Sequence, residues 1–388
     1  PRRGLPLGGG SDGQRAELAL HLGTAAHALD YDDLAWSMDG HPTVVLLPPI
    51  LALADRVEPS GEDVIAAYAA GFETASYVAS PVSPAHYEAG WHATSTFGAL
   101  GATAAAASLL DLDAETTETA LNVAASTPAG VKENFGTMTK PLHAGLASRS
   151  GVTAAVLAAD GFTAGENAIE GSKGFWSLYS GDADPEELPP APTSEAWNLV
   201  EPGIHLKRYP ACYFTHTSIA ATQSLMEDHD VDPEDVTSVS VRAAGGAGDA
   251  LKYAEPETAL QSKFSMPHAV AVALIADRVS VEFFEPEALD DETLAERRQV
   301  VDFAVDDDLP YDSHTATVPI ETAEETYRTV NDTPPWTHQD PPSRDELAAK
   351  FVEAASQTVD EESATTAFDR LQDLPDTDLL TALAPVRD

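Results

Sequence analysis

Two long stretches of small residues place the strongest limit on what this chain can fold into. Residues 96–110 and 144–159 are rich in Ala and Gly and carry almost no charge. Side chains this small allow neighbouring helices to approach closely, and stretches this apolar must be buried. Apolar residues at helical spacing over 64–79 extend the pattern. Residues 15–180 are therefore predicted to form a compact, mostly helical bundle.

Capping signals support two of the predicted helix starts. Asp113 can accept hydrogen bonds from free first-turn N–H groups, which predicts a helix from there to Ala125. Ser343 and Glu346 match a capping box, which opens a helical C-terminal segment reaching residue 383.

The composition changes after residue 180. A Pro-rich, acidic stretch is read as a linker, and a second Pro-rich stretch precedes the C-terminal helices; these are residues 181–192 and 331–342. Three segments with β-branched residues are predicted strands: 236–242, 300–305 and 315–321. Residues 264–276 read as a helix, and 245–248 (Gly-Gly-Ala-Gly) as a flexible turn.

We therefore predict an α+β multidomain protein. A large all-α helical-bundle domain would carry an inserted, smaller α/β domain, because two linkers bracket the α/β segment. The predicted ranges are 1–200 for the first part of the helical domain, 201–335 for the α/β domain, and 336–388 for helices that return to the helical domain.

Charge and cysteine content exclude several classes of function. The chain has 64 acidic and 21 Lys or Arg residues, a formal net charge of -43, which makes nucleic acid a poor partner and predicts a surface adapted to high salt. A single cysteine, Cys212, excludes an internal disulfide and a self-supplied iron–sulfur cluster. No apolar run is long enough to predict a membrane span, and a cytoplasmic protein is expected. The first residues lack Met and a signal-like apolar core, so we expect an N-terminal truncation.

Lysine is scarce, and two of the seven lysines lie in segments unlike ordinary surface. Lys140 lies within residues 133–143 and Lys207 within 207–216, each beside turn-forming residues with a histidine nearby. A strongly acidic protein that binds a multiply charged anion must place cations against its own field. These two segments are therefore candidates for an anion site, although each lysine taken alone could be an ordinary helix-start or surface residue.

Two further segments combine acidic and imidazole groups. The first contains Asp30 with His41, and the second has His92 leading into a predicted helix, where the positive helix end favours neutral imidazole and attracts carboxylate. Taken singly, each histidine fits a structural role, so the case rests on the four segments together. No His-Glu-x-x-His or other metal-ligand spacing occurs, so no metal is predicted.

These segments, in this order, resemble the MmgE/PrpD family, which includes 2-methylcitrate dehydratases, cis-aconitate decarboxylases and iminodisuccinate epimerases. The resemblance runs through residues 28–33, 41–42, 90–92, 133–145, 207–212 and 263–268, and the segment around Lys140 is the most specific. It implies a helical domain with an α/β lid, and a homodimer that acts without a cofactor on small di- or tricarboxylates. Family members usually have additional helical sequence before the position of Gln14.

Carried over residue by residue, the resemblance implies a set of site residues. The catalytic candidates are Asp30, His41, His92, Lys140 and Lys207. The substrate-binding candidates are His268, His143 and Tyr209. Two residues depart from the family pattern: Leu34 replaces a small hydroxyl residue, and His268 replaces a frequent Tyr. Both departures bear on which acid is used and on which reaction follows.

The chemistry implied is removal of a proton or of carbon dioxide next to a carboxylate. Lys140 and Lys207 would stabilise the enediolate charge, and His92 and His41 would serve as the proton-transfer pair. Asp30 would orient one imidazole, and His268 would contact the substrate from the lid. The leading prediction is a lyase like 2-methylcitrate dehydratase, in propionate catabolism. An epimerase of an iminodisuccinate-type acid, a cis-aconitate-type decarboxylase and a non-catalytic carboxylate-binding protein stay open as alternatives.

Overall fold

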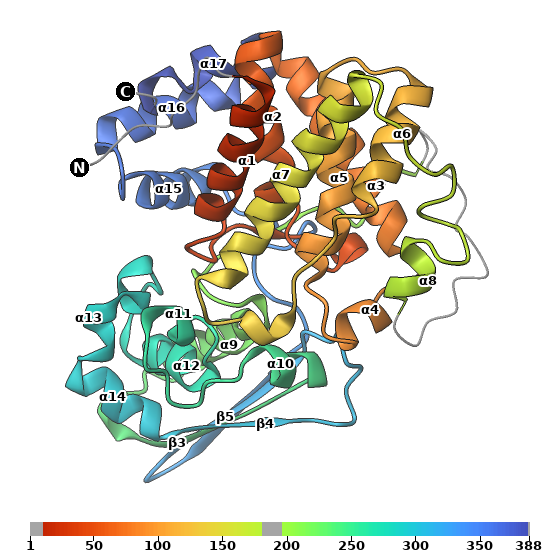
Figure 1. Ribbon diagram of the computed structural model, residues 1–388. Helices are drawn as coiled ribbons and strands as arrows, with labels where there is room; N and C mark the ends of the chain where they lie inside the picture. The colour runs from red at the N-terminus through yellow and green to blue at the C-terminus, as the bar shows by residue number, and fades with distance from the viewer. Residues whose placement is uncertain (1–10, 181–195, 387–388) are drawn as a thin grey trace.

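The computed structural model describes residues 11–180 and 196–386. Helices dominate the first part of the chain (Figure 1). Its helices are α1 (Asp12–Ala26), α2 (Thr43–Val57), α3 (Gly61–Ala79), α4 (Ala85–Glu88), α5 (Ala93–Leu109), α6 (Ala114–Ala124), α7 (Thr139–Ala159) and α8 (Phe175–Tyr179), with 3₁₀ turns η1 (Trp36–Met38) and η2 (Lys132–Asn134). The predicted helices over 64–79, 96–110 and 144–159 are confirmed as α3, α5 and α7, and Asp113 caps α6 by accepting from Thr116 N.

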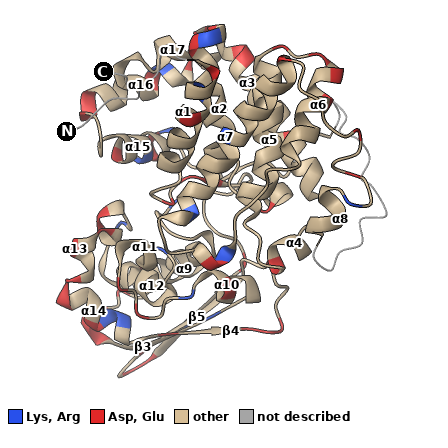
Figure 2. Ribbon diagram, in the orientation of Figure 1, with Lys and Arg blue, Asp and Glu red and all other residues tan. Residues whose placement is uncertain are grey.

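Helix α5 is the centre of this part, and it packs against α2, α3, α6 and α7. It carries no charged residue and is buried along nearly its whole length. Figure 2 shows the acidic residues distributed over the surrounding helices and loops instead. Close approach of α3 and α5 depends on two facing glycines, because a Cβ at Gly71 or Gly101 would lie 2.8 Å from the other residue's carbonyl oxygen. The small residues noted in the sequence are thus a requirement of helix packing.

The second part of the chain is a mixed α/β unit. Its four-stranded sheet has the order β4-β3-β5-β6, in which β3 and β4 are parallel and the other pairs antiparallel. The strands are β3 (Val236–Ala243), β4 (Val301–Val305), β5 (Ala316–Thr322) and β6 (Thr326–Asn331). The helices are α9 (His216–Asp228), α10 (Gly245–Ala250), α11 (Ala259–Ser262), α12 (Met266–Ile275), α13 (Pro286–Leu289) and α14 (Glu292–Gln299), with 3₁₀ turns η3 (Tyr213–Thr215), η4 (Pro233–Asp235) and η5 (Val281–Phe284).

The three predicted strands and the helix over 264–276 are confirmed as β3, β4, β5 and α12. Strand β6 was not predicted, because its charged and hydroxyl residues lack an apolar run. The predicted flexible turn at 245–248 is wrong, since these residues begin α10. A Cβ at Gly246 would lie 2.7 Å from the carbonyl oxygen of Tyr311, so this glycine serves close packing. The predicted linker at 181–192 lies outside the described residues.

The C-terminal segment packs against the helical part. It comprises α15 (Arg344–Ala355), α16 (Glu361–Gln372) and α17 (Leu379–Ala382), with η6 (Leu374–Asp376) and η7 (Ala384–Val386). Ser343 forms the predicted capping box with Glu346. Ala367 and Leu379 share a hydrophobic cluster with Ile50 and Val64 of the first part. The architecture is α+β, as predicted, and the boundaries at residues 200 and 335 stay predictions.

A short antiparallel strand pair, two residues long on each side, connects the first part of the chain to the second. Strand β1 (Asp33–Leu34) pairs with β2 (His205–Leu206), with Asp33 opposite Leu206. This pairing sets residue 207 beside Asp32, and Lys207 N donates to the Asp32 carbonyl at 3.1 Å. In the described ranges 11–180 and 196–386, no helix combines the length and hydropathy needed to cross a bilayer.

The α3–α5 contact gives a stability prediction. Gly101→Ala should lower the free energy of unfolding by about 1–3 kcal/mol, because the added methyl group meets Gly71 O and Ala75 Cβ within 3 Å. Gly13→Ala in α1, where a Cβ meets no atom within 4 Å, is the matched control. It should be neutral or stabilising by about 0.4–1 kcal/mol. Denaturant unfolding of both variants measures the difference, and an equal response of the two would contradict the packing argument.

Candidate active site

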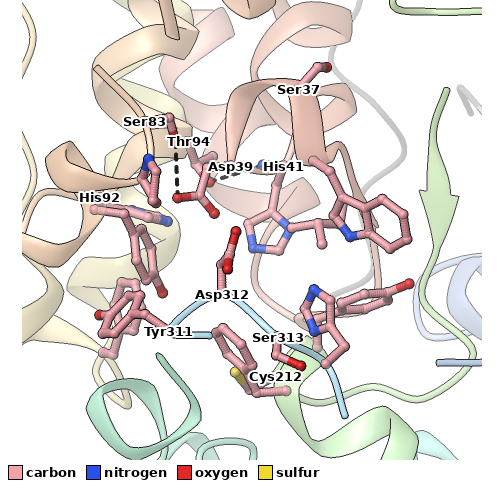
Figure 3. Close-up of a pocket in the computed structure, with 18 of the residues that line it drawn as sticks. Ser37, Asp39, His41, Ser83, His92, Thr94, Cys212, Tyr311, Asp312 and Ser313 are labelled. Atoms are coloured by element: carbon pink, nitrogen blue, oxygen red, sulfur yellow. Dashed lines mark hydrogen bonds between the residues drawn. The ribbon is translucent and has the colours of Figure 1, made fainter. Parts of the chain in front are cut away.

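A cavity of about 650 Å³ is lined by the helical part, by Lys207 and residues 212–214, and by the loop at 310–314 (Figure 3). Five predicted catalytic residues reach its wall: Asp30, His41, His92, Lys140 and Lys207. Aromatic and apolar residues make up much of the remaining wall: Leu34, Trp36, Pro84, Tyr87, Phe135, Tyr213, Phe214, Phe264 and Tyr311. Sequence segments separated by more than 100 residues therefore meet at one cavity.

Asp30 is the centre of a buried ion cluster. It follows α1 in a turn with φ of +53°, a left-handed conformation that Asp tolerates better than most residues. Its carboxylate forms an ion pair with Lys140 and lies 3.1 Å from Lys207 Nζ. Burial alone would raise the pKa of Asp30. The two ammonium groups together lower the pKa by more than burial raises it, so the pKa of Asp30 lies far below its ordinary value. Asp30 is therefore ionised and fully committed to these lysines.

The two lysines reach Asp30 from different parts of the chain. Lys140 lies in the first turn of α7, and its ammonium stands over the rings of Phe135 and Phe264. Lys207 is 0% exposed, donates to the Asp30 carbonyl at 3.2 Å and pairs with Asp32 at 3.3 Å. From the sequence, these ammonium groups were predicted to be the cations of an anion-binding site. In the structure each already has a carboxylate partner, so a bound acid would join an existing ion cluster.

Two further lysines hold the same loop, and the sequence analysis did not select them. Lys263 Nζ donates to the carbonyls of Leu29 at 2.9 Å and Pro210 at 3.1 Å. Lys350 Nζ, from α15, donates to the carbonyls of Asp32 at 3.2 Å and Lys207 at 2.6 Å. Burial lowers the pKa of both ammonium groups to about 8. Scarcity of lysine was the available signal for both residues, and Lys263 also begins the family segment 263–268, which ends at His268.

The protonated nitrogen of His41 is fixed by its surroundings. Its Nδ1 lies 2.5 Å from the carbonyl oxygen of Asp33, and because a carbonyl can only accept, Nδ1 must carry the proton. The neutral ring then has an unprotonated Nε2, and Figure 3 shows the ring directed into the cavity. Burial lowers the pKa of His41 well below 6.5, with Lys207 and Lys140 acting in the same direction against the opposing Asp32. A half-buried, neutral base thus stands at the cavity wall.

His92 is the N-cap residue of α5, as its position before a predicted helix suggested. Its Nδ1 lies 3.0 Å from Nδ1 of His143, and its Nε2 is buried without a hydrogen-bond partner. Burial lowers the pKa of His92 well below 6.5, and Lys140 and His143 lower it further. His143 has its pKa lowered to about 4 by burial, His27 and Lys140. Both rings are therefore neutral near pH 7.

All three predicted substrate-binding residues lie outside the cavity wall, and one of them, His143, contacts His92 instead. Tyr209 directs its hydroxyl to Gln223 Oε1 at 3.2 Å and borders a separate groove. His268 uses both ring nitrogens elsewhere: Nε2 donates to the Phe283 carbonyl at 2.8 Å, and Nδ1 faces Arg298 at 3.2 Å. Sequence position next to a motif could not show which way these side chains turn.

Other residues line the cavity that the sequence analysis did not select. Trp36 stacks on His205 with 3.8 Å between ring centroids, and its ring centroid lies 6.0 Å from that of His314, which also lines the cavity. The hydroxyl group of Tyr213 and the Nδ1 atom of His314 are both buried without a hydrogen-bond partner. Figure 3 shows Asp312 reaching toward Asp39 and His41 from the loop at 310–314. The unpartnered atoms of Tyr213 and His314 are available to hydrogen-bond a bound molecule.

One group of side chains has the composition of a metal site. His27 Nδ1 and His41 Nδ1 lie 3.0 and 3.3 Å from Asp32 Oδ2. However, His41 Nδ1 holds a proton for the Asp33 carbonyl, so it cannot also be a metal ligand. The other oxygen of Asp32 lies 3.3 Å from the Lys207 ammonium, which would repel a cation. The donor set fits a carboxylate that orients two imidazoles.

Comparison with known proteins places these residues in a family. The model of the MmgE/PrpD N-terminal domain matches residues 9–188, and that of the MmgE/PrpD C-terminal domain matches residues 209–374. The chain belongs to the MmgE/PrpD family. The cavity of this MmgE/PrpD protein therefore lies between segments from both family domains.

Curated relatives of this MmgE/PrpD protein include cis-aconitate decarboxylases. The one from Mus musculus is 26% identical over 382 residues, covering 93% of this chain and 76% of the mouse protein. The one from Homo sapiens is 32% identical over 208 residues, covering 52% of this chain and 43% of the human protein. A cis-aconitate decarboxylase-like protein, oryM, of Aspergillus oryzae is 28% identical over 300 residues, covering 71% of this chain and 62% of its own length. The last two alignments thus span less than two thirds of those relatives.

The ion cluster gives a second stability prediction. Lys207→Met should lower the free energy of unfolding by about 3–5 kcal/mol, because it leaves the buried Asp32 without its ammonium partner and Asp30 with only one. Lys173→Met, at an exposed lysine, is the matched control and should change it by less than about 0.5 kcal/mol. Adding Asp32→Asn to Lys207→Met should recover part of the loss. Denaturant unfolding at fixed salt concentration checks all three, and equal effects at 207 and 173 would refute the cluster's structural role.

Proposed function

We propose that this protein is a lyase for a small di- or tricarboxylic acid, acting through histidine-mediated proton transfer without a metal or organic cofactor. The observation that carries the proposal is the fixed tautomer of His41, which leaves an unprotonated Nε2 at a cavity that also contains Lys140 and Lys207. A neutral base beside ammonium groups suits removal of a proton next to a carboxylate, since the developing charge falls near fixed cations.

In this scheme the acid enters with one carboxylate toward the ion cluster. His41 Nε2 takes the proton from the carbon next to that carboxylate, and the electron pair moves into an enediolate stabilised by Lys140 and Lys207. The neighbouring C–O bond then breaks, and His92 Nε2 gives a proton to the departing oxygen, so that water leaves. Asp32 and the Asp33 carbonyl hold the His41 ring in place. Asp30 pairs with both lysines and holds them in position.

Dehydration of a 2-methylcitrate-like acid is the leading reaction within this proposal, because it begins with proton removal by a base such as His41. Decarboxylation of a cis-aconitate-like acid is the second candidate, and the curated relatives favour it. In that case the bond to the departing carboxylate breaks, and His92 supplies the proton that the remaining carbon skeleton requires. A cytoplasmic homodimer stays a prediction from the family resemblance, and so does adaptation to high salt.

A substrate screen in deuterium oxide tests the proposal. The protein should release water or carbon dioxide from one of 2-methylcitrate, citrate, cis-aconitate or iminodisuccinate, as read by nuclear magnetic resonance in molar salt, with or without chelator. Lys140→Met should lower kcat/KM by at least about 100-fold, since it removes a charged group from the developing enediolate. Exchange of the α-hydrogen without loss of a group would indicate an isomerase instead. Binding of these acids without any turnover would indicate a carboxylate-binding protein.

The low pKa of His41 predicts the pH dependence of kcat/KM. Its folded pKa lies well below 6.5, so the base is already unprotonated at pH 6.5, and activity should stay level from about pH 8 down to pH 6.5. Activity should fall only at more acidic pH, as His41 Nε2 becomes protonated. His41→Gln should lower kcat by about 10²–10⁴-fold, because it removes the base. A rate that halves near pH 6.5 in the parental protein would contradict this assignment.

A further inference from the structure

The hydrogen bond between His92 and His143 bears on a step that the proposed function leaves incomplete. In that scheme His92 must give away the proton on Nε2. A neutral imidazole that loses its only proton becomes an imidazolate, which is a very poor product, so a neutral histidine is a weak acid on its own. An imidazolium would be a good acid, but His92 is 2% exposed and lies near Lys140, and both conditions disfavour a positive ring.

The position of His143 removes this difficulty. Its Nδ1 lies 3.0 Å from Nδ1 of His92, and two neutral rings in that arrangement share one proton between the facing nitrogens. If the proton is on His143 Nδ1, then His92 holds its own proton on Nε2, toward the cavity. His92 can then donate at Nε2 while it accepts at Nδ1, and it stays neutral throughout.

The surroundings hold the two rings in register. The His92 backbone N–H donates to the Gly130 carbonyl at 3.1 Å, and the Ser95 hydroxyl donates to the His143 carbonyl at 3.1 Å. Gly130 has φ of +111°, and a Cβ there would lie 3.2 Å from Cγ and 3.3 Å from Nδ1 of His143. The glycine thus lets the backbone lie against the His143 ring. His143 itself retains an exposed fraction of 4%, and Ala129, next to Gly130 in the chain, is exposed.

The other charged and titratable groups near the pair favour a neutral relay. Lys140, His27 and His41 all act on His92 by lowering its pKa, and His27 and Lys140 act likewise on His143. The carboxylates of the cluster, Asp30 and Asp32, are ionised and held by lysines and histidines.

We propose that His143 and His92 form a proton relay that carries a proton from solvent to the substrate. His92 Nε2–H passes its proton to the departing oxygen or to carbon, His143 Nδ1–H passes its proton to His92 Nδ1, and water supplies a proton to His143 Nε2. One proton is consumed from solvent, one reaches the substrate, and both rings end neutral with exchanged tautomers. After product leaves, a cavity water protonates His92 Nε2, His92 Nδ1–H returns its proton to His143 Nδ1, and His143 Nε2 releases its proton. His41 Nε2 releases the proton that it took from the substrate, which restores the starting state. This inference rests on the proposed function, and it assigns His143 a role through His92 in place of substrate contact.

Two substitutions at His143 test the relay. His143→Phe keeps a ring against Gly130 but removes both nitrogens, and it should lower kcat about 100-fold with KM within about 2-fold. Imidazole at rising concentration and constant ionic strength should recover part of that rate, whereas the parental rate should not change. His143→Asn retains an amide that can donate to His92 Nδ1 but cannot be reprotonated in turn, so it should also lose rate. Near-parental kcat in either variant, or a loss in His143→Phe that imidazole leaves unchanged while melting temperature is retained, would overturn the relay.

A spectroscopic measurement tests the pair without any substrate. In ¹⁵N-histidine-labelled parental protein at pH 7, the resting state should show His92 protonated at Nε2 and His143 at Nδ1, with scalar coupling across the N–H···N bond. The His143→Phe spectrum assigns the signals. A proton on Nδ1 of His92, or absence of the coupling, would overturn the relay. If the coupling is present but no acid is turned over, the proposed function fails while the proton arrangement of the pair is supported.

Discussion

Four ammonium groups, three of them on buried lysines and one on the half-buried Lys350, converge on residues 29–32, and the arrangement of the site depends on them. Lys140 comes from α7, Lys207 follows β2, Lys263 precedes α12, and Lys350 comes from α15. Burying an ion is expensive unless partners replace its hydration, so each ammonium fixes where its carboxylate or carbonyl partners lie. The loop with Asp30 in a left-handed conformation is thereby held from the helical part, the α/β part and the C-terminal helices together.

The same cluster prepares the histidines for proton transfer. Burial and Lys140 keep both His41 and His92 neutral, and Lys207 acts in the same direction on His41. Asp32 lies 3.3 Å from His41 Nδ1 and holds the orientation of that ring. A histidine that is neutral at its working pH can take up a proton at once, and it needs a second partner if it is to give one away. The packing of α5 and α7, made close by small residues, brings His92 and His143 near enough to be those partners.

Much of this site was predictable from sequence because its residues lie in compact motifs. Asp30, His41, His92, Lys140 and Lys207 all reach the cavity wall, as the resemblance implied. The fold class followed from periodicity and from the small residues of α5 and α7. Side-chain direction was beyond such reasoning: Tyr209 and His268 adjoin motif residues, yet they face a separate groove and the Phe283 carbonyl.

Lys350 was not predicted as a site residue, because sequence does not show which way its side chain turns. Lys350 reaches the site from a C-terminal helix, and its partners are backbone carbonyls, which leave no trace in sequence. One consequence of the shared cluster concerns how the sequence can change over evolution. Since Asp30 balances two lysines and Lys207 balances two aspartates, the acceptability of a replacement at one position is set by the residues at the others. These positions should therefore change together during evolution, so that a substitution at one of them is accepted only alongside matching substitutions at the others.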